Sequence, residues 1–511
     1  MEKSMMSKKN FQSIFLEEPL LTFGDGKKYI DPKMGLMAYG PCLYKDRNII
    51  SSTIRLGLIG SKDSIELAKN WILKCKKVIP GKSENPNMYP NFLGFTRIFG
   101  SDIRIVDECI EELDKEEIEL CTSHPRYNNR VNNAAKLIIS KLQNLRTREP
   151  RPHVTIIALP QKIIDLCGKR TLEQYRAGIK LTEREKEILK TINKQRRTGQ
   201  TVLVPLTDDI LDLDYETTDL RCLIKANAMV FGMPTQLAKP STFGFEAPGE
   251  SVQHESIRAW NFCTGLYYKA EGYPWKLAEM PIGTCYVGIS FYRVPKLSGG
   301  YIRASLAQIF THTGEGLVLK GSRTIRDRIT KIPHLTKNAS YQLLHNSLEL
   351  YKSQMGEYPK RLVLHKSTRF WSVELEGFKE ATKNIESTDF ISIQTRGIKF
   401  MRRRGKYPPR RGTVIKLSNK NYILFTKGWI ELYETYPGLR VPTPLEVTEH
   451  IGESSIDTIC EEILALTKMN WNSADFCIRE PVTLAYSRQV GKILAYLPEE
   501  IRPRPEYLYY M

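Results

Sequence analysis

The run TCYVGISFYRV at residues 284–294 decides the fold, because it is rich in the β-branched and aromatic side chains that favour strands. Two more strand-like runs follow it, YIRASLAQIF at 301–310 and GLVLKG at 316–321. A helical pattern near 340–354 and the strand RLVLHKS at 361–367 come next. This order predicts a mixed α/β layer in the carboxyl-terminal half of the chain.

The remaining carboxyl-terminal sequence extends that layer. GTVIKL at 412–417 and YILFT at 422–426 predict strands, and helical patterns cover 456–468 and 483–497. Three strands, a helix and another strand suit a ribonuclease-H-like layer. We therefore expect one domain of this kind near the end of the chain.

A second α/β domain is expected upstream. The basic, proline-containing run RTREPRPH at 146–153 predicts a domain boundary. Directly after it, VTIIALP at 154–160 is typical of a buried parallel strand, and VLVPL at 202–206 predicts another.

The first 150 residues have a less regular pattern. LEEPLLTFGDG at 16–26 and DPKMGLMAYGP at 31–41 alternate short extended runs with turn signals. Helical patterns follow at 64–78, at 107–119 and around 132–145.

Length and charge restrict the class of protein. At 511 residues the chain is long enough for two or three domains, each with its own core. Lysine and arginine number 76 against 57 acidic residues, which gives a formal charge of +19. Such a charge favours a polyanionic partner such as nucleic acid, although a generally basic surface without a dedicated ligand gives the same balance.

The densest basic run is RGIKFMRRRGKYPPRRG at 396–412, whose glycines and prolines predict a loop. A loop of this composition either contacts a nucleic-acid backbone or is simply a solvated surface. The candidate backbone contacts are Arg402, Arg403, Arg404, Arg410 and Arg411.

The ten cysteines form no CxxC pair and no zinc spacing, so we expect them to be reduced and mostly buried. The polar, lysine-rich start of the chain does not resemble a signal peptide, and no run approaches eighteen apolar residues. We therefore expect a soluble, cytoplasmic protein that does not contact a membrane.

Four segments together resemble the MID and PIWI domains of prokaryotic Argonautes in order and spacing. They are YYKAEGYPWKLA (267–278), CYVGISFYR (285–293), LVLHKSTRF (362–370) and MNWNSADFCIREPVTLAY (469–486). The ending PVTLAYSRQVGKIL followed by EYLYYM also resembles the end of a PIWI domain.

The resemblance covers about residues 150–511, and the opening sequence is similar to the amino-terminal segment of short Argonautes, which lack N and PAZ domains. It implies an α/β fold with a Rossmann-like MID domain and a ribonuclease-H-like PIWI domain. The expected boundaries are 1–150 for the amino-terminal segment, 151–279 for MID and 280–511 for PIWI.

A guide 5′-phosphate needs fixed donors and positive charge, because a dianion is costly to desolvate. Arg221 and Lys225 are four residues apart and share a helical face, and Gln236 lies just beyond that helix. The resemblance implies that Lys225, Gln236 and Lys269 bind the phosphate. Arg221 takes the place where the family often has a tyrosine or histidine that stacks on the first base, a role that a guanidinium can also fill.

In related proteins the carboxyl terminus reaches this pocket through a divalent ion. The resemblance therefore implies a structural Mg²⁺ held by the terminal carboxylate of Met511, although a frayed terminus is the alternative.

Ribonuclease-H-type cleavage uses two divalent metals held by carboxylates. The family positions for three of them are occupied here by Ser290, Ser367 and Tyr486. A fourth position, a mobile glutamate, could correspond to Glu315. A neutral serine cannot offset the charge of two bound Mg²⁺ ions, so we expect no catalytic residues and no cleavage.

The leading hypothesis is a non-cleaving sensor that uses a small guide RNA to recognise complementary target DNA in prokaryotic antiviral defence. By resemblance to short Argonautes, its output lies in an APAZ-containing partner with a TIR, sirtuin-like or nuclease effector, and complexes could oligomerise on activation. Two alternatives stay open: an active guided nuclease with atypical metal ligands, and a basic nucleic-acid-binding protein that needs no guide.

Overall fold

The computed structural model describes residues 12–42, 53–168, 218–246, 252–294, 301–310, 316–319, 321, 324–326, 332–395, 405–418, 420–438, 440–498 and 500–511. The chain divides into two compact units. The first unit comprises Met1–Ile54, Ile72–Ile103 and Gln253–Met511, and the second comprises Arg55–Trp71 and Arg104–Val252.

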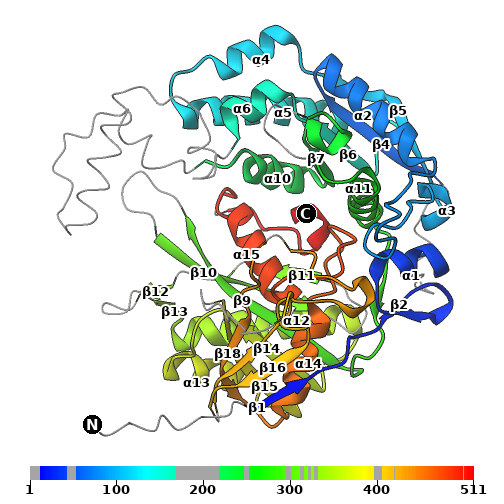
Figure 1. Ribbon diagram of the computed structural model, residues 1–511. Coiled ribbons are helices and arrows are strands. Elements are labelled where there is room, and N and C mark those ends of the chain that lie inside the picture. The colour runs from blue at the N-terminus through cyan, green and yellow to red at the C-terminus, as the bar shows by residue number, and fades with distance from the viewer. Residues whose placement is uncertain are drawn as a thin grey trace, which may run out of the picture. The chain divides into compact units, whose positions relative to one another are not determined.

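A mixed sheet of nine described strands forms the centre of the first unit (Figure 1). Its strands, in spatial order, are β1 (Gln12–Phe15), β16 (Thr413–Lys416), β17 (Tyr422–Leu424), β18 (Leu445–Ile451), β15 (Ser387–Gln394), β14 (Arg361–Lys366), β9 (Thr284–Val294), β10 (Tyr301–Phe310) and β11 (Gly316–Leu319). β14 pairs in parallel with both β9 and β15, and the other pairs are antiparallel. The strands predicted at 284–294, 301–310 and 361–367 are thus confirmed.

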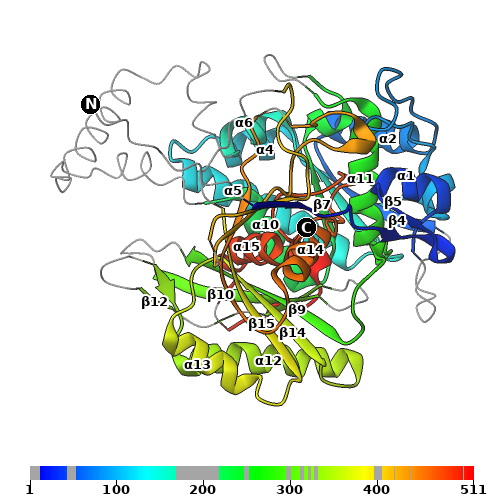
Figure 2. The same ribbon diagram turned by 60° about the horizontal axis from the view of Figure 1, so that its bottom comes forward.

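Helices cover both faces of this sheet, as Figure 2 shows. On one face, α12 (Lys337–Met355) and α13 (Ser372–Ala381) lie side by side, and on the other lie α14 (Ile456–Leu466) and α15 (Val482–Leu494). The α12 and α13 face holds an apolar core that includes Cys285, Val287 and Ile289 of β9.

Because side chains alternate along a strand, Tyr286, Gly288 and Ser290 of β9 face the side of α14 and α15 instead. Gly288 is needed there, since a Cβ at this position would lie 2.2 Å from the Thr483 carbonyl oxygen of α15. The sequence thus allows α15 to approach the middle of the sheet closely.

The first unit also contains shorter elements. A three-stranded sheet has the order β3 (Lys28–Tyr29), β2 (Leu21–Thr22) and β8 (Lys276–Leu277), and β12 (Ile325–Arg326) pairs with β13 (Pro333–His334). The remaining helical elements are η1 (Gly24–Gly26), α1 (Pro32–Tyr39), α3 (Phe95–Phe99), α11 (Glu255–Lys269), η3 (Glu431–Tyr433) and η4 (Tyr507–Tyr510).

The segment 31–41, expected to be extended, contains helix α1. Asp31 caps it by accepting a hydrogen bond from Met34 N, and Pro32 occupies the first turn. The prediction missed this amino-terminal signal.

The second unit carries a sheet whose described strands have the order β5 (Asp102–Glu112), β4 (Thr53–Gly60), β6 (Val154–Ala158) and β7 (Thr235–Ala238). β4, β6 and β7 are parallel. Its described helical elements are α2 (Lys62–Cys75), which ends in the first unit, and α4 (Lys115–Thr122), α5 (Tyr127–Arg146), α6 (Gln161–Cys167), α10 (Leu220–Phe231) and η2 (Pro240–Phe243). A parallel sheet flanked by helices agrees with the predicted α/β class.

Two predicted segments of this unit were not confirmed. The stretch expected as a helix at 107–119 is strand up to Glu112 and helix only from Lys115, because Ile103, Val106 and Cys109 are buried in the sheet layer. The strand expected at 202–206 lies outside the described residues.

The expected domain boundaries differ from the two units. The boundary at 150 falls inside the second unit, because β4 pairs with β6 across it, and the boundary at 279 falls inside the first unit. All ten cysteines are buried and none forms a disulfide, which confirms the predicted burial. Among the described residues, no helix combines the length and apolar character needed to cross a bilayer.

Candidate functional site

Two of the three expected metal-ligand positions lie next to each other, one inside β9 and one directly after β14. β14 and β9 pair with Lys366 opposite Ile289, so Ser367 follows directly beside Ser290. The Ser367 backbone N–H donates to the Ile289 carbonyl at 3.2 Å. Ser290 is buried, and its hydroxyl has no hydrogen-bond partner among the described residues.

The third position, Tyr486, lies on α15 over the same face of the sheet. Thr483, one turn earlier, contacts β14 by a 2.9 Å hydrogen bond to Nδ1 of His365. Tyr486 itself is buried, and its hydroxyl accepts from Trp471 N and donates to Met469 O, both at 3.2 Å. All three positions thus belong to one face, and none carries a carboxylate.

His365, between these positions, is fully buried. Burial lowers the pKa of His365 to about 3, because the charged imidazolium is poorly solvated there, with a smaller contribution from Arg361. The ring is therefore neutral at physiological pH.

The acid nearest in sequence to Ser367 has a different role. Glu374 accepts a hydrogen bond from the buried ammonium of Lys366 at 2.8 Å and also accepts from Leu335 N and Trp371 N. Burial lowers the pKa of Lys366, although Glu374 opposes this effect. The carboxylate of Glu374 therefore fixes the loop after β14 and the start of α13.

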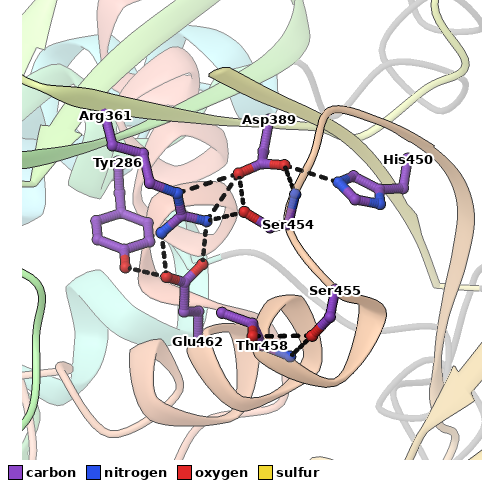
Figure 3. Close-up of polar contacts among 8 residues, drawn as sticks. All are labelled: Tyr286, Arg361, Asp389, His450, Ser454, Ser455, Thr458 and Glu462. Carbon is purple, nitrogen blue, oxygen red and sulfur yellow. Dashed lines mark hydrogen bonds and ion pairs between the residues drawn. The ribbon is translucent and has the colours of Figure 1, made fainter. Parts of the chain in front are cut away.

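The acid of β15, Asp389, belongs to a separate polar network (Figure 3). Its carboxylate accepts from Arg361 at 2.8 Å, from His450 at 2.8 Å and from the Ser454 hydroxyl at 2.6 Å. Burial would raise the pKa of Asp389, but the hydrogen bonds from His450, Ser454 and Arg361 outweigh burial and hold it well below its usual value.

Arg361 connects this network to α14. It pairs with Glu462, which also accepts from the Tyr286 hydroxyl at 2.8 Å. The network joins β9, β14, β15, the segment after β18 and α14, and it uses the carboxylate of Asp389 for that purpose. Sequence reasoning did not find it, because its members are separated by up to 176 residues and share no spacing motif.

Within the part of the chain that the structure describes, no group of three or more histidine, cysteine, aspartate or glutamate side chains is placed to hold a metal ion. Glu315, expected as a mobile ligand, lies outside that part.

Three of the expected guide-phosphate residues belong to the second unit. Lys225 lies in α10 with its side chain buried, and its ammonium donates to the carbonyl oxygen of Thr235 at the start of β7. Gln236 is the next residue of β7, and Arg221 lies one helical turn before Lys225; both are half-buried. α10 begins at Asp219, whose side chain caps the helix by accepting from Cys222 N. The structure therefore brings the α10 lysine to the start of β7.

Lys269 is the last residue of α11 in the first unit and is 2% exposed. Met511 is also buried. It follows η4, which packs against α11 and α15. The divalent ion that the resemblance implies at this terminal carboxylate stays a prediction.

The two described arginines of the basic run differ sharply. The side chain of Arg410 is 41% exposed, pairs with Glu431 and lies over the Phe15 ring at 4.0 Å. Arg411 is 2% exposed and bonds Glu18, Thr426 O and Leu464 O. Its guanidinium is therefore enclosed by protein, which contradicts the expected nucleic-acid contact for Arg411. Arg402, Arg403 and Arg404 lie outside the described residues.

Comparisons with known proteins place this geometry in context. No family model matches the chain. Over 343 residues the chain is 22% identical to the Argonaute protein of Aquifex aeolicus (strain VF5), a match that covers 65% of this chain and 46% of that protein.

Several solved structures share the fold. Clostridium butyricum Argonaute, bound to a guide DNA and a target DNA, has a TM-score of 0.61 at 17% identity, over 98% of this chain and 55% of its own. Aquifex aeolicus Argonaute has a TM-score of 0.54 at 16% identity, over 100% of this chain and 56% of its own. Drosophila Piwi has a TM-score of 0.56 at 11% identity, over 98% of this chain and 56% of its own.

The chain thus spans about half the length of the relatives that it matches. The shared architecture confirms the predicted α/β fold class and is consistent with MID and PIWI domains. In sequence and in fold, the chain is thus similar to Argonaute proteins.

Proposed function

We propose that this chain recognises target nucleic acid through a bound guide, does not cut it, and signals the match to a partner effector. One observation carries the proposal: Ser290 inside β9 and Ser367 directly after β14 lie side by side under α15, with Tyr486 on that helix, where a cleaving relative needs carboxylates. Two divalent metals at this place would meet neutral hydroxyls, which cannot balance their charge.

The acids near these positions are committed to other contacts. Glu374 is bound to Lys366 and to two backbone N–H groups, and Asp389 is bound to Arg361, His450 and Ser454. Moving Glu374 to a metal would leave the buried ammonium of Lys366 without its carboxylate partner, at a cost of about 3–5 kcal/mol. Moving Asp389 would break its bonds to Arg361, His450 and Ser454. This supports recognition without cleavage over an atypical nuclease.

In the proposed function the guide 5′-phosphate is bound by Lys225, Gln236 and Lys269, and Arg221 stacks on the first base. The terminal carboxylate of Met511 would hold a Mg²⁺ ion there, which would supply further positive charge to the phosphate. The proposal takes the guide as RNA and the target as DNA. Clostridium butyricum Argonaute binds a DNA guide, so both guide chemistries belong in the test.

Target pairing would then change the state of a bound partner. A heteroduplex supplies its own sequence specificity, and the protein needs only to hold its backbone geometry. We propose an APAZ-containing partner that carries a TIR, sirtuin-like or nuclease effector and acts in defence against invading nucleic acid, with oligomerisation on activation.

The first test measures binding of 5′-phosphorylated and 5′-hydroxyl guides, as RNA and as DNA. Replacing Lys225 and Lys269 together with alanine should weaken the phosphorylated guide on the order of a hundredfold more than the hydroxyl guide, since each charge-assisted contact is worth roughly 1.5–3 kcal/mol. The exposed lysines Lys352 and Lys383, changed to alanine together, are the matched control. Equal losses for both guides would refute the pocket.

The second test incubates the guided protein with labelled complementary target and Mg²⁺ or Mn²⁺, alone and with the co-purified partner. We expect capture of matched target, no cut by this chain, and effector turnover such as NAD loss only when the partner is present. Guide-directed cutting by the isolated chain that is abolished by changing Glu315 would refute the proposal.

A further inference from the structure

Tyr486 has a set of contacts that a metal-binding aspartate could not make. Its ring stacks on Tyr507 with centroids 3.6 Å apart and planes within 9°. Its hydroxyl accepts from Trp471 N and donates to Met469 O. One side chain thus joins α15 to the carboxyl-terminal element η4 and to the segment 469–472.

The segment 469–472 in turn contacts α11. The Trp471 indole lies 4.8 Å from the ring of Tyr268, which directly precedes Lys269. A Cβ placed on Gly265 would lie 3.4 Å from Asn472 O and 3.6 Å from Lys269 Nζ. The ammonium of Lys269 and the segment 469–472 therefore meet at the same turn of α11.

The second partner of Tyr486 leads to the same helix. η4, which contains Tyr507, packs against both α11 and α15, and Gln489 of α15 donates to Tyr510 O at 3.0 Å. Two routes thus run from Tyr486 to the helix that carries Lys269, one through Trp471 and one through Tyr507.

These routes are tightly packed. Trp471 is 1% exposed, Lys269 2% and Tyr486 3%, so a gap opened at one residue has no solvent to fill it and displaces its neighbours. Burial also raises the pKa of the Tyr486 hydroxyl far above its usual value, so the hydroxyl keeps its proton and remains a donor to Met469 O at neutral pH.

We propose that Tyr486 is a positioning residue for the guide 5′-phosphate: it fixes the segment 469–472 and η4 against α11, and thereby fixes Lys269. The position that holds a catalytic metal in a cleaving relative serves here to support guide binding. This inference rests on the proposed function, in which Lys269 contacts that phosphate.

The test compares two variants of the full chain with a core control. Tyr486→Phe keeps the ring stack and removes the hydroxyl bonds, and Tyr486→Leu removes both. Tyr351→Leu changes another buried tyrosine, in the core between α12 and the sheet, and controls for general destabilisation. The readout is the ratio of affinities for 5′-phosphorylated and 5′-hydroxyl guides of one sequence.

We expect Tyr486→Leu to lower that ratio about tenfold and Tyr486→Phe about threefold, because the first variant loses the hydroxyl bonds and the ring stack and the second loses the hydroxyl bonds alone. Tyr351→Leu should leave the ratio within about twofold, because a general loss of stability weakens both guides alike.

The outcomes separate the inference from the proposed function. A wild-type protein that prefers the phosphorylated guide, with Tyr486 variants that keep the same ratio, overturns the inference alone. A wild-type protein without that preference refutes the phosphate pocket and the inference with it. Should Tyr486→Leu fail to fold, an unchanged ratio in Tyr486→Phe overturns the inference.

Discussion

Glu18 joins the amino-terminal segment to the carboxyl-terminal layer through two ion pairs. Its carboxylate lies between two buried cations, 2.9 Å from Arg411 Nε and 2.9 Å from Lys468 Nζ. The side chains of Arg411 and Lys468 are 1% and 0% exposed. Burial would raise the pKa of Glu18, but Arg411 and Lys468 outweigh it and hold that pKa below its usual value.

Replacing Glu18 with glutamine or alanine should therefore be strongly destabilising. Removing one partner of a buried ion pair typically costs about 3–5 kcal/mol, because the remaining charge is left uncompensated in a poorly polarisable interior. Here two cations lose the same partner, so the upper part of that range applies. Lys468 keeps its bonds to Pro19 O and Ile30 O, and Arg411 keeps those to Thr426 O and Leu464 O, which limits the loss.

The assay is denaturant unfolding monitored by tryptophan fluorescence, with Glu17 as the matched control. Glu17 is the exposed neighbour, and Glu17→Gln should shift stability by no more than about 0.5 kcal/mol. The difference between wild type and Glu18→Gln should be insensitive to salt, because the pair is buried. If Glu18→Gln and Glu17→Gln change the stability equally little, the ion pairs of Glu18 do not hold the amino-terminal segment in place.

The ion pairs of Glu18 also predict that the stability of the protein depends on pH. Because the folded-state pKa of Glu18 is lowered, its stabilisation is present above the ordinary value of 4.5 and is lost as pH falls below it. The difference in free energy of unfolding between wild type and Glu18→Gln should therefore become smaller below pH 4.5. A difference in free energy of unfolding that stays constant down to about pH 3 would contradict the lowered pKa of Glu18.

Two further predictions concern the face under α15. The pKa of His365 is lowered by burial to about 3, so only the unfolded chain takes up a proton between pH 6.5 and 3, and acidification favours unfolding. From pH 7 to 5 this contributes about 2 kcal/mol of lost stability, and His365→Gln should show a correspondingly shallower pH dependence in denaturant unfolding; identical slopes would exclude a buried neutral imidazole. Gly288→Val should cost about 3 kcal/mol or more, because its Cβ would meet the Thr483 carbonyl oxygen at 2.2 Å, whereas Gly265→Ala, with no contact closer than 3.4 Å, should cost far less by the same measurement.

Local pattern predicted much of the fold. The strands β9, β10 and β14 and the helices α5, α12, α14 and α15 match runs whose periodicity differs clearly between 2 and 3.6 residues. Local pattern was also the source of the wrong predictions. Residues 107–112 contain enough acidic side chains to suggest a helix, yet they form part of a sheet edge, where pairing overrides the weaker helix propensity.

The candidate site was predictable only where the fold determines it from sequence order. Ser290 and Ser367 each follow the last paired residues of the parallel strands β9 and β14, so their adjacency follows from the strand pairing. The partners of Glu18 and Tyr486 do not follow from any pattern. Arg411 lies 393 residues from Glu18, and no rule of spacing connects residues so distant along the chain.

The three positions that lack carboxylates differ from one another in their contacts, and this difference supports the proposed absence of cleavage. Ser290 is a buried hydroxyl without a hydrogen-bond partner among the described residues, an arrangement that costs stability and serves no contact there. Tyr486 instead makes two hydroxyl hydrogen bonds and a ring stack. An aspartate at Tyr486 would lose the stack and place a charge in a fully packed interior, so restoring carboxylates at all three positions would disturb α15 and η4 before it could assemble a metal site. A metal site would need a carboxylate at position 486, whereas the observed packing needs the ring and hydroxyl of Tyr486.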